Sequence, residues 1–280
     1  MRVFLTGATG YIGSAVVREL INAGHKVVGL TRWSSGAAIL KEAGAEVHYG
    51  ALDDLDSLQS AAAAADGVIH LAFKHDFSDF AGSLASDLRA VVAMGGVLEG
   101  SKKPFITTAH ANGEVSDNTV MALAKRGVRT SVVSLSPTVH GVGDKGFVPT
   151  LINIARDKGF SAYIGDGSNR WPAVHRLDAA HLYRLALEKA PAGSRLYGRA
   201  EEGVPFRDIA HVIGKHLNVP VVSIPRGEAD AHFGFLGAIA VLDIPSVMPG
   251  SATQTRELLG WIPVQPGLIK DLEQGHYFDN

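Results

Sequence analysis

The chain has 280 residues, of which 46% are hydrophobic and 19% are charged, so it is long enough to bury a sizeable globular core. Its 26 basic and 28 acidic side chains give a net charge of −2, which argues against nucleic acid as a partner. Cysteine is absent, which excludes disulfides, thiolate metal sites and cysteine nucleophiles. The twelve histidines are scattered along the chain, and we therefore expect no bound metal.

No apolar stretch is long enough to cross a bilayer, and the one at residues 233–244 is interrupted by Gly234, Gly237 and Asp243. The first strand begins at the N-terminus, where a leader peptide would otherwise stand. These features predict a cytoplasmic protein with no membrane partner. The sequence leaves a homodimer open.

Residues 2–13, RVFLTGATGYIG, form a short apolar run followed by three glycines spaced three apart. Residues 3–5 are predicted to form a buried strand, and residues 14–24 continue as a helix. Gly7 permits a tight turn, Gly10 lets the backbone approach a pyrophosphate, and Gly13 lets the helix pack closely on the strand. The pattern indicates nucleotide binding at a helix N-terminus.

The segment TGATGYIG resembles the opening of the extended and atypical short-chain dehydrogenases/reductases, a superfamily that includes nucleotide-sugar epimerases. The resemblance implies a dinucleotide cofactor and a small-molecule substrate. It places cofactor contacts in the glycine-rich turn, at Gly7, Thr9, Gly10, Tyr11, Ile12 and Gly13.

Residues 25–31 are predicted to form the second strand, and Arg32 stands at its end. An acidic residue at this place would bind the ribose 2′-hydroxyl of NAD. A guanidinium can instead pair with a 2′-phosphate, and Ser34 lies close enough in sequence to add a hydrogen bond. The sequence therefore favours NADP over NAD.

The next two predicted strands, residues 45–50 and 67–72, each end at an expected cofactor contact. The resemblance implies that Leu52 contacts the adenine, although Ala51 replaces the acidic residue that is usual before it. The segment GVIHLA resembles the superfamily's strand beneath the nicotinamide ribose, which places Leu71, Ala72 and Phe73 at the cofactor.

Candidate catalytic residues follow in the next helix and strand. Residues 76–101 are predicted to be mostly helical, and Asp87 lies where the resemblance implies an active-site side chain. Residues 103–108 are predicted to form the fifth strand, after which the superfamily keeps a serine or threonine for the substrate carbonyl. Thr108 is the candidate for that role, and His110 follows it.

The superfamily's catalytic Tyr-x-x-x-Lys motif is missing. No tyrosine occurs between Tyr49 and Tyr163, and the expected helix, residues 116–126, is too short to hold the motif. The usual proton relay therefore cannot form. A proton would have to come from one of the following groups or from water: His75, His110, His140, Thr108 or Tyr163.

The segment SPTVHGVG, after a predicted strand at residues 129–135, resembles the superfamily's segment beside the nicotinamide carboxamide. This implies cofactor contacts at Pro137 and Val139, with His140 in place of the usual tyrosine. The run from residue 160 to 187 resembles the extended branch, in which Arg170 would meet a substrate phosphate. Trp171 could instead present an apolar wall, and we expect His75, His140, Arg170 and Trp171 near the substrate.

Alternating strands and helices predict an α/β fold, a doubly wound parallel sheet of the Rossmann type with a smaller substrate-covering lobe. The core is expected to span residues 1–146, completed by residues 174–200. The lobe is expected to comprise residues 147–173 and 201–280.

The sequence favours an NADP-dependent oxidoreductase that transfers hydride to or from a small carbonyl or alcohol substrate. Two alternatives remain open from the sequence. One is a catalytically silent NADP-binding sensor, favoured by the missing motif. The other is a nucleotide-sugar epimerase or dehydratase, favoured by Arg170 and opposed by the same missing tyrosine.

Overall fold

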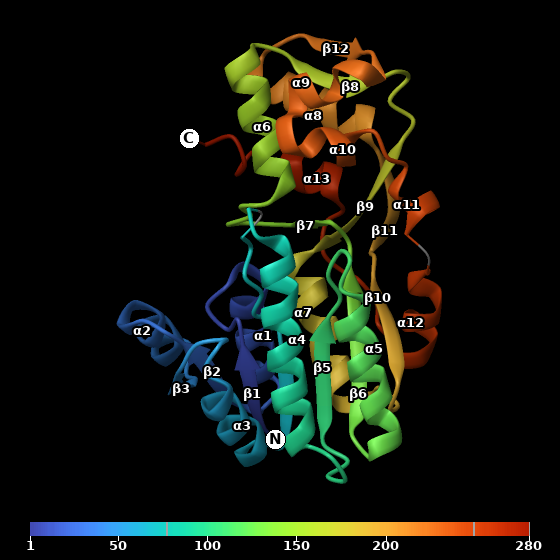
Figure 1. The fold of residues 1–280 in the computed structure, drawn as a ribbon. Coiled ribbons are helices and arrows are strands. Elements are labelled where there is room, and N and C mark those ends of the chain that lie inside the picture. The colour runs from blue at the N-terminus through green and yellow to red at the C-terminus, as the bar shows by residue number, and fades with distance from the viewer. Residues whose placement is uncertain (77, 249, 280) are drawn as a thin grey trace. The chain divides into compact units, whose positions relative to one another are not determined.

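The computed structural model describes residues 1–76, 78–248 and 250–279, and the chain forms two compact units (Figure 1). Unit 1 comprises Met1–Ser134, Ala179–Leu196 and Gln254–Trp261. Unit 2 comprises Leu135–Asp178, Tyr197–Thr253 and Ile262–Asn280. Within the described ranges, every helix is too short or too polar to cross a membrane.

A seven-stranded sheet with the order β10-β6-β5-β4-β1-β2-β3 forms the centre of unit 1. The strands from β1 to β6 pair in parallel along this order. The order reverses at β1, and a ligand crevice forms at the carboxyl ends of the strands at such a point. The strands are β1 (Arg2–Thr6), β2 (Lys26–Thr31), β3 (Glu46–Tyr49), β4 (Gly67–His70), β5 (Pro104–Thr108), β6 (Arg129–Leu135) and β10 (Ser194–Gly198).

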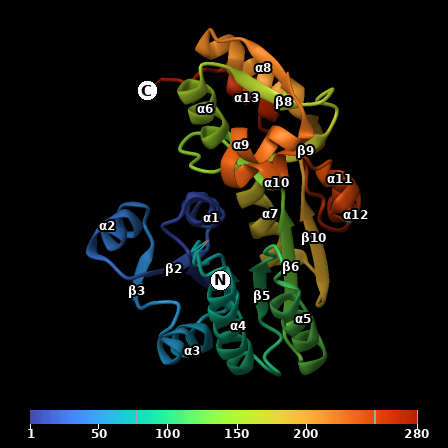
Figure 2. The same ribbon diagram turned by 45° about the horizontal axis from the view of Figure 1, so that its top comes forward.

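Helices cover both faces of this sheet (Figures 1 and 2), with α3, α4 and α5 on one face and α1 and α7 on the other. Phe4, Val68 and Phe105 point into the first face, and their alternation with Val3, Ile69 and Ile106 follows the two-residue period of a strand. The helices are α1 (Tyr11–Asn22), α2 (Ser34–Glu42), α3 (Leu55–Ala64), α4 (Phe80–Val97), α5 (Glu114–Leu123), α7 (Arg176–Lys189) and α12 (Ala252–Leu259).

Unit 2 contains a three-stranded sheet, β11-β9-β7, and a two-stranded sheet, β12-β8. Its core is built around Trp171 and Phe206, whose rings meet edge to face with their centroids 4.9 Å apart. The strands are β7 (Thr138–His140), β8 (Ser161–Ile164), β9 (Arg170–His175), β11 (Glu201–Pro205) and β12 (Val221–Ile224). The helices are α6 (Phe147–Lys158), α8 (Phe206–Leu217), α9 (Ala229–Phe233), α10 (Gly237–Ala240), α11 (Ile244–Val247) and α13 (Leu268–Glu273).

The predicted fold class, a doubly wound parallel sheet, is confirmed. The long helix expected at residues 76–101 is shorter, since α4 begins at Phe80, and Phe77 lies outside the described residues. β7 is a strand that the sequence did not predict. The chain passes from unit 1 to unit 2 at Ser134 and returns at Ala179, while the predicted limits were 146 and 174. Residues 254–261, expected in the lobe, belong to unit 1.

Candidate functional site

The turn after β1 contains three glycines whose surroundings differ. Gly7 has a φ of +69°, and a Cβ on it would lie 2.7 Å from the carbonyl carbon of Leu71. A Cβ on Gly13 would lie 2.0 Å from the oxygen of Gly7, so the fold itself requires glycine at both positions. A Cβ on Gly10 would meet only the Gly7 oxygen, at 3.1 Å, in an ordinary backbone conformation. The space beside Gly10 is therefore left for something other than the protein.

The polar groups that the glycine-rich turn presents are the backbone N–H groups of the first helical turn of α1. Gly10 is the N-cap of α1, and no side chain caps the helix. No acidic residue stands in the first turn, so the positive end of the helix dipole is not neutralised there. Thr9 and Gly10 are exposed, and Tyr11 and Ile12 are half-buried. The turn fits the pyrophosphate of a dinucleotide.

The end of β2 carries an exposed cation. The guanidinium carbon of Arg32 lies 5.6 Å from the ring centroid of Trp33, and Ser34 begins α2 next to them. Within the described part of the chain, Arg32 has no carboxylate partner. The group is therefore available to an anion. Leu52, by contrast, packs in the core of the sheet, which leaves little of its side chain for an adenine.

A buried hydrogen-bonded chain runs from β1 through β4 to α4. The Oγ1 of Thr6 lies 2.6 Å from the Nδ1 of His70, and the Nε2 of His70 lies 3.2 Å from Asp87 Oδ1. Ser116 also donates a hydrogen bond to Asp87. Burial acts to raise the pKa of Asp87, but the hydrogen bonds and the two nearby histidines together hold that pKa below its usual value.

His110 faces the same carboxylate from the segment that follows β5. Its Nε2 lies 3.8 Å from Asp87 Oδ1, too far for a hydrogen bond but close enough for charge interaction. Its ring stacks on Phe73, with the centroids 4.0 Å apart. Burial lowers the pKa of His110 to about 4, although the charge of Asp87 acts in the opposite direction. His110 is therefore neutral at pH 7 in the cofactor-free protein.

Thr108, the last residue of β5, has an unexpected neighbour. The hydroxyl of Tyr183, from α7, lies 2.6 Å from Thr108 Oγ1. Tyr183 is fully buried, and burial raises its pKa above the usual value. Either hydroxyl could donate in this contact. Thr108 is the one hydrogen-bond partner of Tyr183 in the described residues, so we assign the donated hydrogen to Tyr183, which would otherwise have no acceptor for it. The hydrogen of Thr108 is then free to point elsewhere.

Two residues of unit 1 frame this segment. Phe73 lies edge-on to His75 and to Phe80, with centroid distances of 5.4 and 5.8 Å. The carboxyl of Asp117 on α5 is also perturbed: burial, opposed by Arg195 at 3.8 Å, raises its pKa to about 6. The structure thus brings Asp87 and His110 together beside Phe73 and His75, while the Thr108 side chain points to Tyr183 of α7, on the other face of the sheet.

In unit 2, the candidate residue His140 on β7 lies in a second carboxylate cluster. Its Nδ1 donates to Asp271 Oδ2 at 2.8 Å, and the Nε2 of His276 donates to Asp271 Oδ1 at 3.0 Å. The hydrogen bonds from the two histidines outweigh burial and lower the pKa of Asp271. His140 is fully buried, and Val139 is half-buried beside it on β7, two residues after Pro137.

The remaining candidates in unit 2 do not form an open site. Trp171 is fully buried between Phe147 and Phe206, so the expectation that it forms a wall beside a substrate is wrong. Arg170 forms a bidentate ion pair with Asp243, with both nitrogen–oxygen distances 2.9 Å. Tyr163 on β8 packs its ring over His211.

Asp178 lies within the first turn of α7, and its carboxylate accepts hydrogen bonds from the backbone of Val264 and Gln265. It therefore ties a later segment of unit 2 to the start of that helix.

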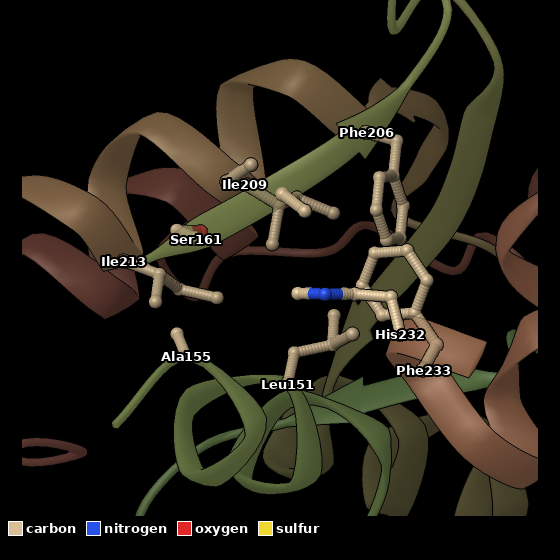
Figure 3. Close-up of a pocket in the computed structure, with 10 residues that line it drawn as sticks. Leu151, Ala155, Ser161, Phe206, Ile209, Ile213, His232 and Phe233 are labelled. Carbon is tan, nitrogen blue, oxygen red and sulfur yellow. The ribbon is translucent and has the colours of Figure 1, made fainter. Parts of the chain in front are cut away.

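A cavity in unit 2 lies among apolar side chains from α6, β8, α8 and α9, and the ring of His232 points into it (Figure 3). The space open to the centre of a water molecule is about 10 Å³, which is room for about one water. It is therefore a packing defect rather than a substrate site. Across the described ranges, no group of three or more His, Asp or Glu side chains is arranged to hold a metal ion.

Comparison with known proteins identifies the family. The model of the NAD dependent epimerase/dehydratase family matches residues 3–94. An uncharacterized protein of Schizosaccharomyces pombe is 46% identical over 99% of this chain and 100% of its own length. The chain belongs to the NAD-dependent epimerase/dehydratase family. It is thus a short-chain dehydrogenase/reductase with an NAD(P)-binding Rossmann sheet.

Other members of the family are more distant. The 2-alkyl-3-oxoalkanoate reductase of Stenotrophomonas maltophilia is 27% identical over 79% of this chain and 77% of its own length. The UDP-glucuronic acid 4-epimerase of Bacillus cereus, solved with UDP-glucuronic acid and NAD, superposes with a TM-score of 0.75 at 16% identity, covering 99% of this chain and 98% of that one. The latter likeness shows the shared fold of the family.

The sequence missed two residues at this site. Tyr183 is 75 positions from Thr108, and His70 is 64 positions from Thr6. Each lies on an element whose pattern is explained by burial alone. No signal in the sequence distinguishes them from ordinary core residues.

Proposed function

We propose that this member of the epimerase/dehydratase family is an NADP-dependent oxidoreductase acting on a small carbonyl or alcohol substrate. The observation that carries the proposal is the group at the end of β5, where Thr108 offers a hydroxyl hydrogen and His110 faces the Asp87 carboxylate. Thr108 ends a strand of the sheet whose glycine-rich turn leaves space beside Gly10, and His110 follows two residues later. A hydrogen-bond donor and a proton-exchanging group are what carbonyl reduction requires of the protein.

The cofactor would be held by the turn after β1 and by the end of β2. The N-terminus of α1 and the open side of Gly10 suit the pyrophosphate, and Arg32 suits the 2′-phosphate. The half-buried residues after β4 would border the cofactor, with Thr6 fixing the N–H groups of Leu71 and Ala72. When bound, NADP(H) supplies or accepts the hydride.

Thr108 and His110 have separate tasks in this proposal. Because Tyr183 donates to Thr108, the Thr108 hydroxyl can donate its own hydrogen to the substrate oxygen. His110 exchanges the proton: as the cation it gives a proton to the oxygen of a carbonyl under reduction, and as the neutral ring it takes one from an alcohol. Asp87 stabilises the cationic form by its charge.

An apolar carbonyl compound is the favoured substrate class. Phe73 packs against the rings of His75, Phe80 and His110, which makes the segment after β4 aromatic. The relative from Stenotrophomonas maltophilia is named as a reductase of alkyl-substituted 3-oxo acids, which supports carbonyl reduction. A nucleotide sugar is less well supported, because Asp243 occupies the guanidinium of Arg170.

The test is NADPH consumption with a panel of aldehydes, ketones, 3-oxo acids and quinones, followed at the absorbance of the reduced cofactor. We expect turnover with at least one carbonyl compound. Tight NADPH binding with no turnover on any acceptor would favour the silent sensor. Turnover of a UDP- or dTDP-sugar would favour the epimerase alternative.

Cofactor choice has its own test. Arg32→Ala should weaken NADPH binding at least tenfold and leave NADH binding nearly unchanged, since charge-assisted hydrogen bonds are worth about 1.5 to 3 kcal/mol. Arg18→Ala removes another exposed arginine, on α1, and serves as the control. Equal losses for both cofactors in Arg32→Ala would remove the assignment to NADP.

The glycine turn is tested in the same way. Gly10→Val should abolish cofactor binding in calorimetry while the protein stays folded, because the new side chain fills the space beside the turn. Gly96→Val, in α4 where nothing lies within 4 Å of the new Cβ, is the matched control. Unchanged affinity in Gly10→Val would show that the cofactor does not bind there.

A further inference from the structure

His70 is a buried titratable residue to which the proposed chemistry gives no task. Its side chain is 2% exposed, and it lies on β4 between Thr6 of β1 and Asp87 of α4. A buried histidine with hydrogen bonds at both ring nitrogens has its protonation state set by those partners.

The hydrogen of Thr6 can be placed by counting its hydrogen bonds. The Thr6 hydroxyl oxygen accepts from the backbone N–H of Ala72 at 3.1 Å, and it shares the N–H of Leu71, at 3.2 Å, with the carbonyl oxygen of Thr6, at 3.3 Å. A hydroxyl has one hydrogen and two acceptor positions, and both acceptor positions are then used. The contact with His70 Nδ1 at 2.6 Å is therefore a hydrogen bond that Thr6 donates.

This places the proton of His70 as well. Since Nδ1 accepts, it carries no hydrogen, and the neutral ring must carry its proton on Nε2. Nε2 then donates to Asp87 Oδ1, which as a carboxylate can only accept. The order of donation along the chain is thus Thr6 to His70 to Asp87.

We infer that His70 is a positioning residue, fixed by Thr6 as the neutral Nε2–H form, that holds the Asp87 carboxylate ionised and oriented beside His110. Its part in turnover rests on the proposed function, whereas its protonation state does not. Two donors, His70 and Ser116, satisfy Asp87, and its charge acts on His110 without a hydrogen bond. His110 therefore keeps its own nitrogens for the substrate.

The other titratable groups around the Asp87 carboxylate leave His70 as the histidine that holds it. Besides the two histidines, the titratable groups that act on this cluster are Asp117 of α5 and His75. Asp117 is opposed by Arg195, and Glu114 lies further along the same helix turn. His70 is the one ring among them that is hydrogen-bonded to Asp87 at an ordinary distance.

The series of hydrogen bonds from Thr6 through His70 to Asp87 also begins at the predicted cofactor turn. Thr6 directly precedes Gly7, and the same oxygen that orients His70 holds the N–H groups of Leu71 and Ala72. The hydroxyl of Thr6 thus joins the turn to Asp87 through hydrogen bonds, and the charge of Asp87 acts on His110 across 3.8 Å.

Nitrogen NMR of the wild-type protein labelled with ¹⁵N-histidine tests the inference without any substrate. We expect the neutral ring of His70 to show the Nε2–H form, its signals being assigned by their loss in His70→Gln. Thr6→Ser keeps the hydroxyl and should preserve this form, whereas Thr6→Val should lose it. A cationic His70, or an Nδ1–H form in the wild type, would overturn the inference.

Titration of Asp87 by ¹³C-carboxyl NMR tests the consequence. His70→Leu removes the donor and should raise the Asp87 midpoint by about one pH unit or more. His70→Gln offers an amide oxygen for Thr6 and an amide N–H for Asp87, and it should restore the midpoint to within a few tenths of a unit. His48→Gln, at a histidine whose partner is Ser57, is the matched control. An unchanged midpoint in His70→Leu would show that His70 does not hold the carboxylate.

Once a substrate is known, the same variants separate positioning from simple packing. His70→Leu should shift the pH profile of kcat that is set by His110, and His70→Gln should restore it. Equal losses in both variants with an unshifted profile would reduce His70 to a packing residue. Absence of all turnover would count against the proposed function, while the two NMR results would stand by themselves.

Discussion

Asp87 in unit 1 and Asp271 in unit 2 each lie between a buried histidine and a partly exposed one. The buried partners, His70 and His140, have side chains 2% and 1% exposed, and the outer partners, His110 and His276, are 17% and 21% exposed. The contacts differ, however. Both histidines of unit 2 are hydrogen-bonded to Asp271, at 2.8 and 3.0 Å, while His110 stands 3.8 Å from Asp87.

The free groups also lie at different places in the two clusters. In unit 1 the buried His70 is satisfied at both nitrogens, and the outer His110 is the loosely held member. In unit 2 the Nε2 of the buried His140 has no partner among the described residues, and the outer His276 is bonded. The first arrangement presents a titratable group at an accessible edge. The second ties β7 to α13 and the segment after it, as Tyr277 also does by bonding Gly141 and Asp144.

The largest expected effect separates the two outer histidines. His110→Ala should lower the rate of carbonyl reduction by about 10² to 10⁴, the usual contribution of a general acid. The NADPH dissociation constant and the Tm should change little. His276→Ala, the matched variant of unit 2, should leave kcat unchanged. A similar loss of rate in both variants would abolish the distinction between the clusters.

The two carboxylates should differ in their effect on stability. Asp271→Asn leaves one of its two histidine donors without an acceptor, and we expect it to cost about 3 kcal/mol, measured by denaturant unfolding. Asp87→Asn removes a hydrogen-bond acceptor from one histidine only, His70. It should therefore cost about half as much unfolding free energy as Asp271→Asn, while lowering the rate of carbonyl reduction more. The reverse order of stabilities would show that the Asp87 cluster, not that of Asp271, is the structural one.

Acid should destabilise the protein through its neutral histidines. The pKa of His110 is about 4 when folded and near 6.5 when unfolded, so between these values the unfolded chain binds the extra proton. This contribution to stability is complete above pH 6.5 and is lost as the pH falls, by about 2 kcal/mol between pH 7 and 5. His110→Gln should reduce the fall in Tm as the pH is lowered from 7 to 5. Burial also lowers the pKa of His232, and His232→Phe should flatten it further. An unchanged slope in both variants would contradict these assignments.

The smallest expected effect concerns the two buried tyrosine hydroxyls. Tyr183→Phe removes the donor to Thr108 and should lower kcat about fivefold, since a hydrogen bond contributes about 1 kcal/mol. Tyr277→Phe removes a hydroxyl of similar environment from unit 2 and should lower the Tm without changing kcat. An unchanged kcat in Tyr183→Phe would show that Thr108 needs no such donor. The same conclusion would follow if Thr108→Ser is active and adding Tyr183→Phe to it lowers kcat no further.

The sequence could predict the features that depend on residues close together in the chain, but not the contacts between distant elements. The strand, the glycine turn and α1 were predictable because their pattern is contained within residues 2–22, and the parallel sheet follows from alternating elements. Asp87, Thr108 and His110 were named from the resemblance. Their partners Tyr183 and His70 come from distant elements, and only the folded chain brings them together.

Trp171 and Arg170 show what the motif alone could not predict. Their positions in a familiar motif suggested contact with a substrate, but a motif does not report what else the fold places beside it. The aromatic core of unit 2 surrounds Trp171, and Asp243, 73 positions away from Arg170, neutralises the guanidinium. The missing Tyr-x-x-x-Lys motif, in contrast, is a plain property of the sequence.

The most direct test of the central claim is the pH dependence of both reaction directions between pH 5 and 9. With His110 as the acid and its pKa near 4, carbonyl reduction should slow by about tenfold for each unit of pH, because the cationic fraction falls in that proportion. Alcohol oxidation, which uses the neutral ring, should stay flat over the same range, and His110→Ala should remove the slope of reduction. A flat profile for reduction that is the same in the wild type and in His110→Ala would contradict the account.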